Sequence, residues 1–410
     1  MTLRRQLPVH SPVRMPDVAR AAAVTATGRV PDRQELESRL ARHFGAHDAL
    51  LTDSGTSALV LALRLTAAPR APVAFPAYGC VDLVAAAIEA GVRVRLYDVD
   101  PSTLSPDLAS LRAACVRGVE AVVVAHLYGY PADVAGAALV AADFGVPVIE
   151  DAAQGIGGAL HGQPLGSFGD LTVLSFGRGK GVTCGGGGAL LAASDAWADV
   201  IRAAEDLLVS PAQGWAPLAS LAAQWALGRP SVYAIPCAIP GLRLGEMVYR
   251  PAHEPRAMSN AAVRMLRAAW DEVDDAVERR RANGFTLTTL ARNARSVRPI
   301  RVVSGGTPGF LRMAVLDAGA RSPAPALGIV RPYPRALHDM SELWPIVAPG
   351  GRRHPGADEL VRSLFTLPTH EWVDERDLAA CERWLNEPRL RMIGTSTPVS
   401  TYRRSEVGVP

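Results

Sequence analysis

The sequence predicts an α/β fold, with a large domain in which helices flank a mostly parallel sheet and a smaller C-terminal α+β domain. Between residues 49 and 149, short apolar runs typical of strands alternate with helical runs. Repeated β-α units of this kind build parallel sheets that carry helices on both faces. Beyond Arg301 the strands and turns become shorter and the alternation ends. A chain of 410 residues is long enough for two such domains.

Each expected element follows from its local pattern. A helical pattern begins near Asp32, where Leu36, Leu40 and Phe44 share one face. Strands are expected at 49–52, 73–75, 92–97, 121–125, 146–149 and 189–192. One further helix is expected to begin at residue 58, and another is expected to end at residue 90. Helices are also expected at 108–116, 131–144, 195–208, 258–285 and 377–385.

We divide the chain into an N-terminal arm (1–30), a large domain (31–250), a small C-terminal domain (251–390) and a polar tail (391–410) that we expect to be disordered. The large domain ends in a segment, 209–250, that has almost no charge. Its apolar run at 216–228 is shorter than the ~20 residues that a membrane-spanning helix needs. We therefore expect this segment to be buried or to form an interface, and we expect no membrane anchor.

The composition restricts the classes of function. Apolar residues make up 49% and charged residues 20% of the chain, as in ordinary globular proteins. A net charge of +3 does not indicate a nucleic-acid partner. The five cysteines are scattered without a C-x-x-C pair, and the first 30 residues lack the apolar core of a secretion signal. These observations predict a cytoplasmic protein with free thiols.

Lys180 is the only lysine in the sequence. Arginine keeps its proton in proteins, whereas a desolvated lysine amine can lose its proton and attack a carbonyl carbon. A compositional drift towards arginine would spare lysine where the chemistry requires it. The other interpretation is a single lysine left by chance in an exposed loop, and composition alone does not decide between the two.

Polar residues also lie at the ends of predicted strands, where parallel sheets bind their ligands. The turn at 54–57 leads into an apolar helix, so it is either an anion site at a helix N-terminus or a plain N-cap. Asp151 ends another strand. Two phosphate motifs are incomplete: a Walker A loop would need glycine at Leu174, and the third glycine of a dinucleotide fingerprint falls at Cys184.

Taken together, the motifs of this chain resemble those of the DegT/DnrJ/EryC1/StrS family of pyridoxal-phosphate-dependent sugar aminotransferases. The resemblance covers about residues 34–385, with the motifs in the family's order. The first motifs are Ser-Gly-Thr at 54–56, Pro-Ala-Tyr at 76–78, His-Leu-Tyr-Gly at 126–129, Glu-Asp-Ala-Ala-Gln at 150–154, and Ser-Phe at 175–176 followed by Lys180. Later matches are Gly-Ile at 328–329, Tyr-Pro at 333–334, Leu-His at 337–338 and Leu-Pro-Thr-His at 367–370.

The resemblance implies a PLP-transferase fold of type I and pyridoxal 5′-phosphate (PLP) as the cofactor. It implies that Lys180 forms an imine with the cofactor and carries a proton between the cofactor and the substrate. Asp151 would pair with the pyridine nitrogen, and Gln154 would hydrogen-bond to the phenolic oxygen. The residues implied in binding the phosphate are Gly55, Thr56, Ser57 and Ser175.

Three positions depart from the family pattern. Cys80, which we count among the cofactor-binding positions, stands where the family usually has an aromatic residue that stacks on the cofactor ring. Gly186 replaces a glutamate, and the family's Asn-Tyr-Arg-Met segment appears only as Arg-Ala-Met-Ser at 256–259. These departures predict substrate contacts that differ from those of the sugar enzymes.

The function implied by the resemblance is transfer of an amino group from glutamate or glutamine to a ketone. The ketone would be a keto-sugar linked to a nucleotide, or a related ketone. Glycan or natural-product biosynthesis would be its setting, and a homodimer would complete each active site with its partner chain. One alternative is a PLP-binding protein with a regulatory role. Another is a different Schiff-base reaction, such as sugar dehydration. Relatives that dehydrate carry histidine in place of the lysine, so Lys180 argues against dehydration.

Overall fold

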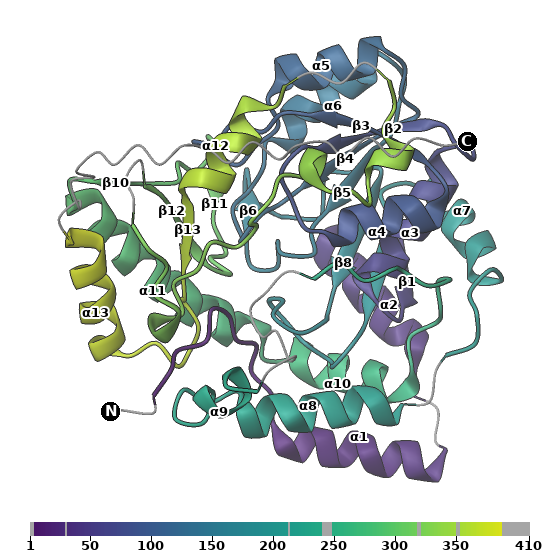
Figure 1. The fold of residues 1–410 in the computed structure, drawn as a ribbon. Coiled ribbons are helices and arrows are strands. Elements are labelled where there is room, and N and C mark those ends of the chain that lie inside the picture. The colour runs from purple at the N-terminus through teal and green to yellow at the C-terminus, as the bar shows by residue number, and fades with distance from the viewer. Residues whose placement is uncertain are drawn as a thin grey trace, which may run out of the picture.

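The structure is a computed structural model that describes residues 4–28, 31–211, 214–239, 248–317, 321–349 and 353–387. Its centre is a seven-stranded sheet with the order β1-β9-β8-β5-β4-β2-β3 (Figure 1). The strands are β1 (Asp48–Thr52), β2 (Pro72–Pro76), β3 (Arg93–Tyr97), β4 (Ala121–Ala125), β5 (Val148–Asp151), β8 (Leu171–Ser175) and β9 (Gly188–Ala192).

The large sheet is mostly parallel, as the alternation of strands and helices predicted. From β3 through β2, β4 and β5 to β8, each strand runs parallel to its neighbour. Only β9 reverses the direction, since it pairs antiparallel with both β8 and β1. The predicted α/β fold class is confirmed.

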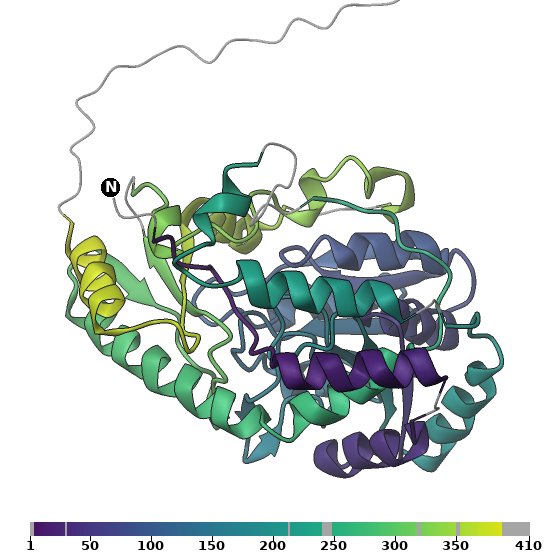
Figure 2. The same ribbon diagram turned by 90° about the horizontal axis from the view of Figure 1, so that it is seen from below.

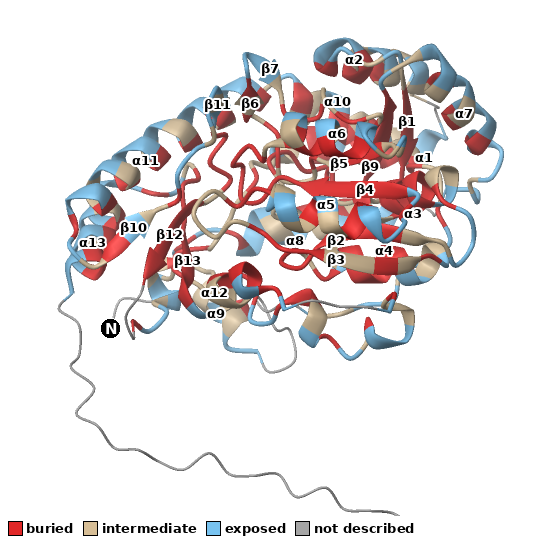
Figure 3. Cartoon of the chain, turned by 90° about the horizontal axis from the view of Figure 1, so that it is seen from above, coloured by how far each residue is buried: buried red, intermediate tan, exposed pale blue. Residues whose placement is uncertain are grey.

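Helices cover both faces of the sheet because alternate side chains of its buried strands point to opposite sides. Val73 and Phe75 of β2 pack in the same core as α3, α4 and α7, whereas Ala74 between them packs with α5 and α6. Figure 3 shows the buried strands of this sheet flanked by helices. The helices between residues 33 and 205 are α2 (Arg33–Phe44), α3 (Gly55–Thr66), α4 (Asp82–Ala90), α5 (Leu108–Val116), α6 (Val134–Ala142) and α7 (Asp195–Glu205).

The C-terminal part forms a smaller sheet, with the order β10 (Val297–Pro299), β12 (Met313–Asp317) and β13 (Leu364–Leu367). It packs with α11 (Val273–Asn293), α12 (Pro355–Ser363) and α13 (Glu375–Asn386). Its core, which contains Phe365 and Trp384, also takes in Tyr78 and Tyr128 from the turns after β2 and β4. The small sheet therefore packs against the edge of the large sheet at which ligands are expected.

A third sheet of short strands joins these two parts. Its order is β11 (Gly306–Thr307), β6 (Ala159–Leu160) and β7 (Gln163–Pro164), so that β11, from the C-terminal part, pairs with β6 from the large domain.

The N-terminal arm is partly helical. Helix α1 (Met15–Thr27) lies against α8 (Trp215–Leu227) and α10 (Asn260–Trp270) (Figure 2). Val18 and Ala21 of α1 are buried in the same core as Leu218 and Ala261. This helix is not evident from the sequence, because its apolar face is recognised only when α8 and α10 cover it.

The single helix expected at 258–285 is instead two helices, α10 and α11, and the second extends to Asn293. No glycine or proline marks the break after Trp270. Trp270 and Val273 are both buried on either side of it. Between them, Asp271 forms an ion pair with Arg39, and Glu272 forms one with Arg14. The break between the two helices therefore coincides with tertiary packing and ion pairs, and not with a glycine or proline.

The described part of the segment 209–250 contains α8 and the short helix α9 (Ala234–Cys237). Leu218 and Leu221 are buried, whereas Trp215 is 51% and Ile235 is 58% exposed. No helix among the described residues has the length and apolar character needed to cross a membrane. The tail predicted to be disordered, 391–410, lies outside the described residues.

Candidate active site

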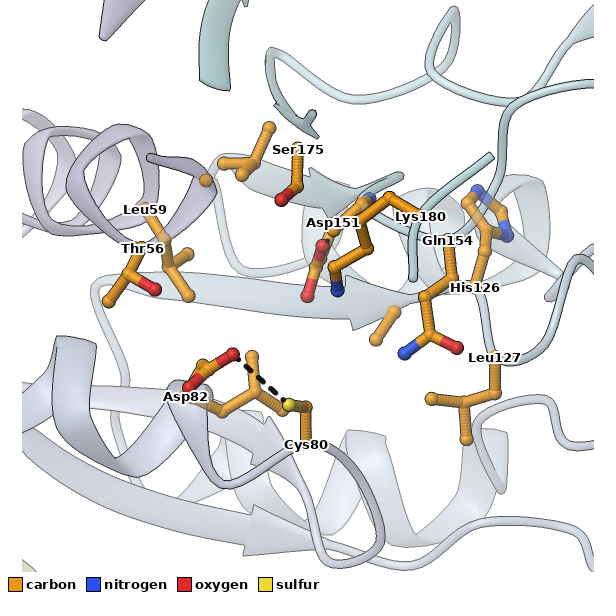
Figure 4. Close-up of a pocket in the computed structure, with 15 residues that line it drawn as sticks. Thr56, Leu59, Cys80, Asp82, His126, Leu127, Asp151, Gln154, Ser175 and Lys180 are labelled. Carbon is orange, nitrogen blue, oxygen red and sulfur yellow. Dashed lines mark hydrogen bonds between the residues drawn. The ribbon is translucent and has the colours of Figure 1, made fainter. Parts of the chain in front are cut away.

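A pocket lies at the carboxyl ends of the central strands (Figure 4). Asp151 ends β5 and Ser175 ends β8, while Cys80 follows β2 and His126 follows β4. Parallel strands bring their carboxyl ends to one edge of the sheet, so these residues meet although they are far apart in the sequence. Every cofactor-binding residue predicted from the sequence lines this pocket except Ser57: Gly55, Thr56, Cys80, Asp151, Gln154, Ser175 and Lys180.

One end of the pocket is the N-terminus of α3. The first N–H groups of a helix have no partner within it, and together with the helix dipole they favour an anion. Gly55 and Thr56 line the pocket there, beside the hydroxyl of Ser175. A Cβ atom on Gly55 would lie only 2.6 Å from the Cβ of Ser175, so glycine permits the close approach of strand β8 to the helix.

Ser57 lies behind this anion end rather than in it. Its hydroxyl donates to the Oδ1 of Asp53 at 2.6 Å, and its N–H donates to the Oγ of Ser54 at 3.0 Å. Ser54 is thus the N-cap of α3, so the N-cap interpretation of this turn is confirmed, and the anion site at the same helix end stays a prediction. The side chain of Ser57 serves the turn, and its predicted contact with a cofactor is absent from the pocket lining.

Asp151 and Lys180 form the centre of the pocket, where their side chains lie side by side (Figure 4). Oδ1 of Asp151 accepts a hydrogen bond from the N–H of Ala153 at 3.0 Å. Burial raises the pKa of Asp151, and the nearby Lys180 acts against this rise. A buried carboxylate of this kind is stabilised by a cation, which an aromatic ring nitrogen becomes on protonation.

The loop that carries Lys180 is held by a residue that the sequence analysis missed. Arg280 of α11 is buried, and it donates to the carbonyl oxygen of Gly181 at 2.9 Å and to that of Ile156 at 3.1 Å. Burial lowers the pKa of Arg280 to about 10. Ser11 of the N-terminal arm also donates to the carbonyl oxygen of Lys180. No local motif predicts these contacts, because Arg280 lies 99 residues from Gly181 in the sequence.

Gln154 is fixed by two hydrogen bonds. Its Oε1 accepts from the N–H of Tyr128 at 3.0 Å, and its Nε2 donates to the hydroxyl of Tyr333 at 2.9 Å. The hydroxyl groups of Tyr78 and Tyr128 are 3.3 Å apart, and the ring of Tyr333 packs against both rings. This tyrosine cluster joins the small domain to the pocket.

His126, which lines the pocket, forms a fully buried pair with Glu150, with 2.7 Å between Nε2 and Oε1. Nδ1 of His126 accepts from the N–H of Ala132, so Nε2 carries the proton and donates to Glu150. Although burial acts to raise it, the hydrogen bonds from His126, Phe168 and Gly169 hold the pKa of Glu150 below its usual value. The pair fixes the chain after β4 and β5.

Asp82, at the start of α4, is a second pocket residue that the sequence analysis did not single out. The thiol of Cys80 donates to its Oδ2 at 3.3 Å (Figure 4). Burial and then the charge of Asp82 raise the pKa of Cys80, so the thiol stays protonated. The sequence did offer a signal for Asp82, because it lies two residues after Cys80, in the first turn of a helix that follows a strand.

Two of the departures lie outside the pocket lining. Gly186 has open space around it, since a Cβ atom there would meet only the carbonyl oxygen of Asp53, at 3.8 Å. The segment 256–259 runs beside β1, where the N–H and carbonyl of Arg256 bond to Asp53. Within the single chain, neither position borders the space next to Lys180.

Comparison with known proteins identifies the family. Residues 14–216 match the sequence model of the DegT/DnrJ/EryC1/StrS aminotransferase family. This part of the chain, residues 14–216, belongs to the family. The chain is 36% identical over 162 residues to a UDP-N-acetyl-3-dehydro-alpha-D-glucosamine 3-aminotransferase of Acidithiobacillus ferrooxidans, a match that covers 39% of this chain and 44% of the relative.

Another relative is a dTDP-4-dehydro-2,3,6-trideoxy-D-glucose 4-aminotransferase of Saccharopolyspora spinosa, 31% identical over 192 residues, which are 45% of this chain and 50% of that protein. The chain thus spans about half the length of the curated relatives it matches. A solved DegT/DnrJ/EryC1/StrS aminotransferase from Brucella abortus has the same fold, with a TM-score of 0.70 and 20% identity over 90% of this chain and 95% of that one. The predicted PLP-transferase fold is confirmed.

Family membership implies pyridoxal 5′-phosphate as the cofactor. The residues of the pocket fit this group. The helix N-terminus at Gly55 and Thr56, with the Ser175 hydroxyl, could bind its phosphate. Asp151 could bind a protonated ring nitrogen, and Lys180 is the amine beside it.

Proposed function

We propose that this protein is a PLP-dependent aminotransferase that moves an amino group from glutamate or glutamine to the ketone of a nucleotide-linked sugar or a related ketone. Its setting would be glycan or natural-product biosynthesis in the cytoplasm. The observation that carries the proposal is the placement of Lys180 and Asp151 together beside an anion end at α3. The names of two relatives, which act on UDP- and dTDP-linked keto-sugars, support the substrate class.

When bound, pyridoxal phosphate supplies a conjugated ring that takes up the electron pair left on the substrate carbon after deprotonation. Asp151 keeps the ring nitrogen protonated, because its buried carboxylate is stabilised by a neighbouring positive charge. Thr56, Ser175 and the N–H groups of α3 bind the phosphate, and Gln154 orients the ring through its amide.

Lys180 moves the proton. Its Nζ would accept the proton from the substrate carbon and pass it to the cofactor, which arginine cannot do. Arg280 keeps the backbone next to Lys180 in place through the carbonyl of Gly181. We regard Arg280 as a positioning residue, since it acts through the loop and not on the substrate.

We further propose that the protein acts as a homodimer in which the partner chain completes each active site. The support is an exposed apolar surface formed by the segment before and within α8 and α9. Its exposed residues are Leu207, Val209, Trp215, Trp225, Leu227, Ile235 and Ile239. A partner chain that packs on these segments would cover their exposed apolar side chains.

The test is turnover by the purified protein with its cofactor. A panel of keto-sugar nucleotides is incubated with glutamate, and release of 2-oxoglutarate is measured, with Lys180→Arg as the matched inactive control. Production of 2-oxoglutarate that depends on both the ketone and Lys180 supports the proposal. A protein that binds the cofactor but transfers no amino group to any ketone of the panel would instead favour the regulatory alternative.

A further inference from the structure

A second cavity, of about 220 Å³, lies at the outer edge of the large sheet and shares no lining residue with the pocket around Lys180. We call it the β3 cavity, because it opens beside the edge strand β3. The fold brings three separate segments together there: β3, the end of α5, and a C-terminal segment made of residues 338–348 with His354. The polar residues that matter for its chemistry are Arg95, Arg117, His338, His354 and Trp344.

Three buried nitrogen atoms of this lining have no hydrogen-bond partner among the described residues. They are Nε of Arg95, Nδ1 of His338 and Nδ1 of His354. His354 is only 4% exposed, and its ring packs 5.5 Å from that of His338. Buried polar atoms nearly always have a partner, so three of them, one from β3 and two from the C-terminal segment, around one cavity indicate a missing polar ligand.

The charge of the cavity indicates the sign of that ligand. No acidic side chain lines it, and neither Arg95 nor Arg117 forms an ion pair within the described residues. The one hydrogen bond of the Arg95 guanidinium recorded there goes to the carbonyl oxygen of Pro349, at 3.0 Å. Burial and the charges of Arg117 and Arg93 lower the pKa of Arg95, as expected for cations without a counter-ion. An anion would satisfy both arginines.

The remaining walls indicate what the anion is attached to. Leu96, Val347 and Ala348 give one apolar side. Trp344 stands at the rim, 63% exposed, with its indole N–H bonded to the carbonyl oxygen of His338 at 3.2 Å. A fixed indole face beside two arginines suits a planar ring that carries a phosphate, because aromatic faces stack on bases and guanidinium groups bind phosphate.

We propose that the β3 cavity is a binding site for a nucleoside phosphate, separate from the active site. Arg95 and Arg117 bind the phosphate, the unpaired imidazole nitrogens of His338 and His354 hydrogen-bond to the ligand, and Trp344 stacks on the base. His338 is available at Nδ1 because its other nitrogen, Nε2, is 3.1 Å from Oδ1 of Asp358 and donates to it.

The experiment measures binding of uridine 5′-monophosphate, adenosine 5′-monophosphate and inorganic phosphate to the cofactor-loaded protein by calorimetry. Arg95→Gln and Arg117→Gln are each expected to weaken nucleotide binding about tenfold or more, as for loss of a charge-assisted hydrogen bond. Trp344→Leu should weaken binding of both nucleotides and leave that of phosphate unchanged. The matched control is Arg112→Gln on α5, which removes the same charge outside the lining and should leave affinity unchanged.

Because Arg117 is exposed, its substitution should not disturb folding, which a thermal melt of each variant checks. Nucleotide binding that survives both arginine substitutions would place the nucleotide in the pocket around Lys180 and overturn the proposal. Absence of nucleotide binding would also overturn it, and would leave water as the partner of the three nitrogens. Inorganic phosphate bound as tightly as both nucleotides would overturn the stacking of a base on Trp344.

Discussion

At the scale of single residues, the chemistry of the pocket depends on which side chains the strand ends bring together. Lys180 is the only lysine in the chain, and its side chain lies next to the carboxylate of Asp151. Cys80 and Asp82 face them from the start of α4. These four side chains allow two direct tests.

We predict that Lys180→Arg abolishes amino transfer while the protein still folds, because arginine keeps the charge but cannot take up a proton. In the unsubstituted protein, reduction with borohydride followed by peptide mapping should place the cofactor mass on Lys180. Arg178→Gln, which removes an exposed charge two positions away, is the control and should retain activity. Cofactor mass on another peptide, or turnover by Lys180→Arg, would contradict the assignment.

We predict that Cys80→Phe tightens cofactor binding. Cys80 lines the pocket, and an aromatic ring at this position gains a stacking contact worth about 0.5–1.5 kcal/mol, or up to about tenfold in affinity. Titration of the apoprotein with pyridoxal phosphate measures the change. Cys80→Ser, which adds no ring, is the matched control. Equal or weaker binding by the phenylalanine variant would mean that Cys80 does not face the ring.

The sequence predicted the members of the pocket better than the contacts that fix them. Asp151 could be predicted because it follows a strand of a parallel sheet, which places it at the ligand-binding edge, whereas Ser175 was assigned from the family motif alone, without a predicted strand before it. Arg280 could not, because its partners Gly181 and Ile156 lie on distant loops that only the folded chain brings to α11. Ser57 was assigned to the pocket from a motif, whereas its hydroxyl is engaged by Asp53.

At the scale of secondary-structure elements, two helices set the shape of the large domain near the site. The N-terminus of α3 approaches β8 closely at Gly55. Helix α2 packs against β1, where Oε1 of Glu37 accepts from the N–H of Leu51 at 3.0 Å. Each contact gives a measurable consequence.

We predict that Gly55→Ala lowers cofactor affinity and stability. The new methyl group would lie 2.6 Å from Cβ of Ser175, so α3 must move away from β8 at a cost of about 1–3 kcal/mol. Calorimetric unfolding and cofactor titration measure both effects. The control is Gly186→Ala, whose methyl group meets only the carbonyl oxygen of Asp53 at 3.8 Å and should change neither quantity. Full affinity in Gly55→Ala would show that the helix end does not bind the phosphate.

We predict that Glu37→Gln stabilises the protein at pH 8 but not at pH 4. Burial raises the pKa of Glu37 from 4.5 to about 7, so the folded state binds this proton more tightly than the unfolded state. The free energy of unfolding therefore falls as the pH rises from about 4.5 to about 7. This loss amounts to about 1–3 kcal/mol, and glutamine, which does not ionise, avoids it. Unfolding in urea at both pH values measures it. Equal effects at both pH values would contradict the shift.

At the scale of the whole molecule, the sequence predicted six of the seven strands of the large sheet, because the alternation of strands and helices is local, but it did not predict β8 at Leu171–Ser175. It missed α1 and the break between α10 and α11, since both depend on packing between segments that are distant in the chain. Trp270 and Val273 remain buried on either side of the break without any local signal. The exposed surface of α8 and α9 has no cover within the described single chain, and it motivates the last prediction.

We predict that the protein sediments as a dimer at micromolar concentration and that the double substitution Trp215→Glu and Ile235→Glu makes it monomeric. Both side chains are more than half exposed, so charge there opposes an apolar interface without disturbing the core. The monomer should lose amino-transfer activity if the partner chain completes the active site. Leu139→Glu is the matched control, because Leu139 is 73% exposed on α6, away from α8 and α9, and its substitution should leave the dimer intact. A fully active monomer would contradict the prediction, and co-sedimentation with lipid vesicles would instead assign the apolar surface to a membrane.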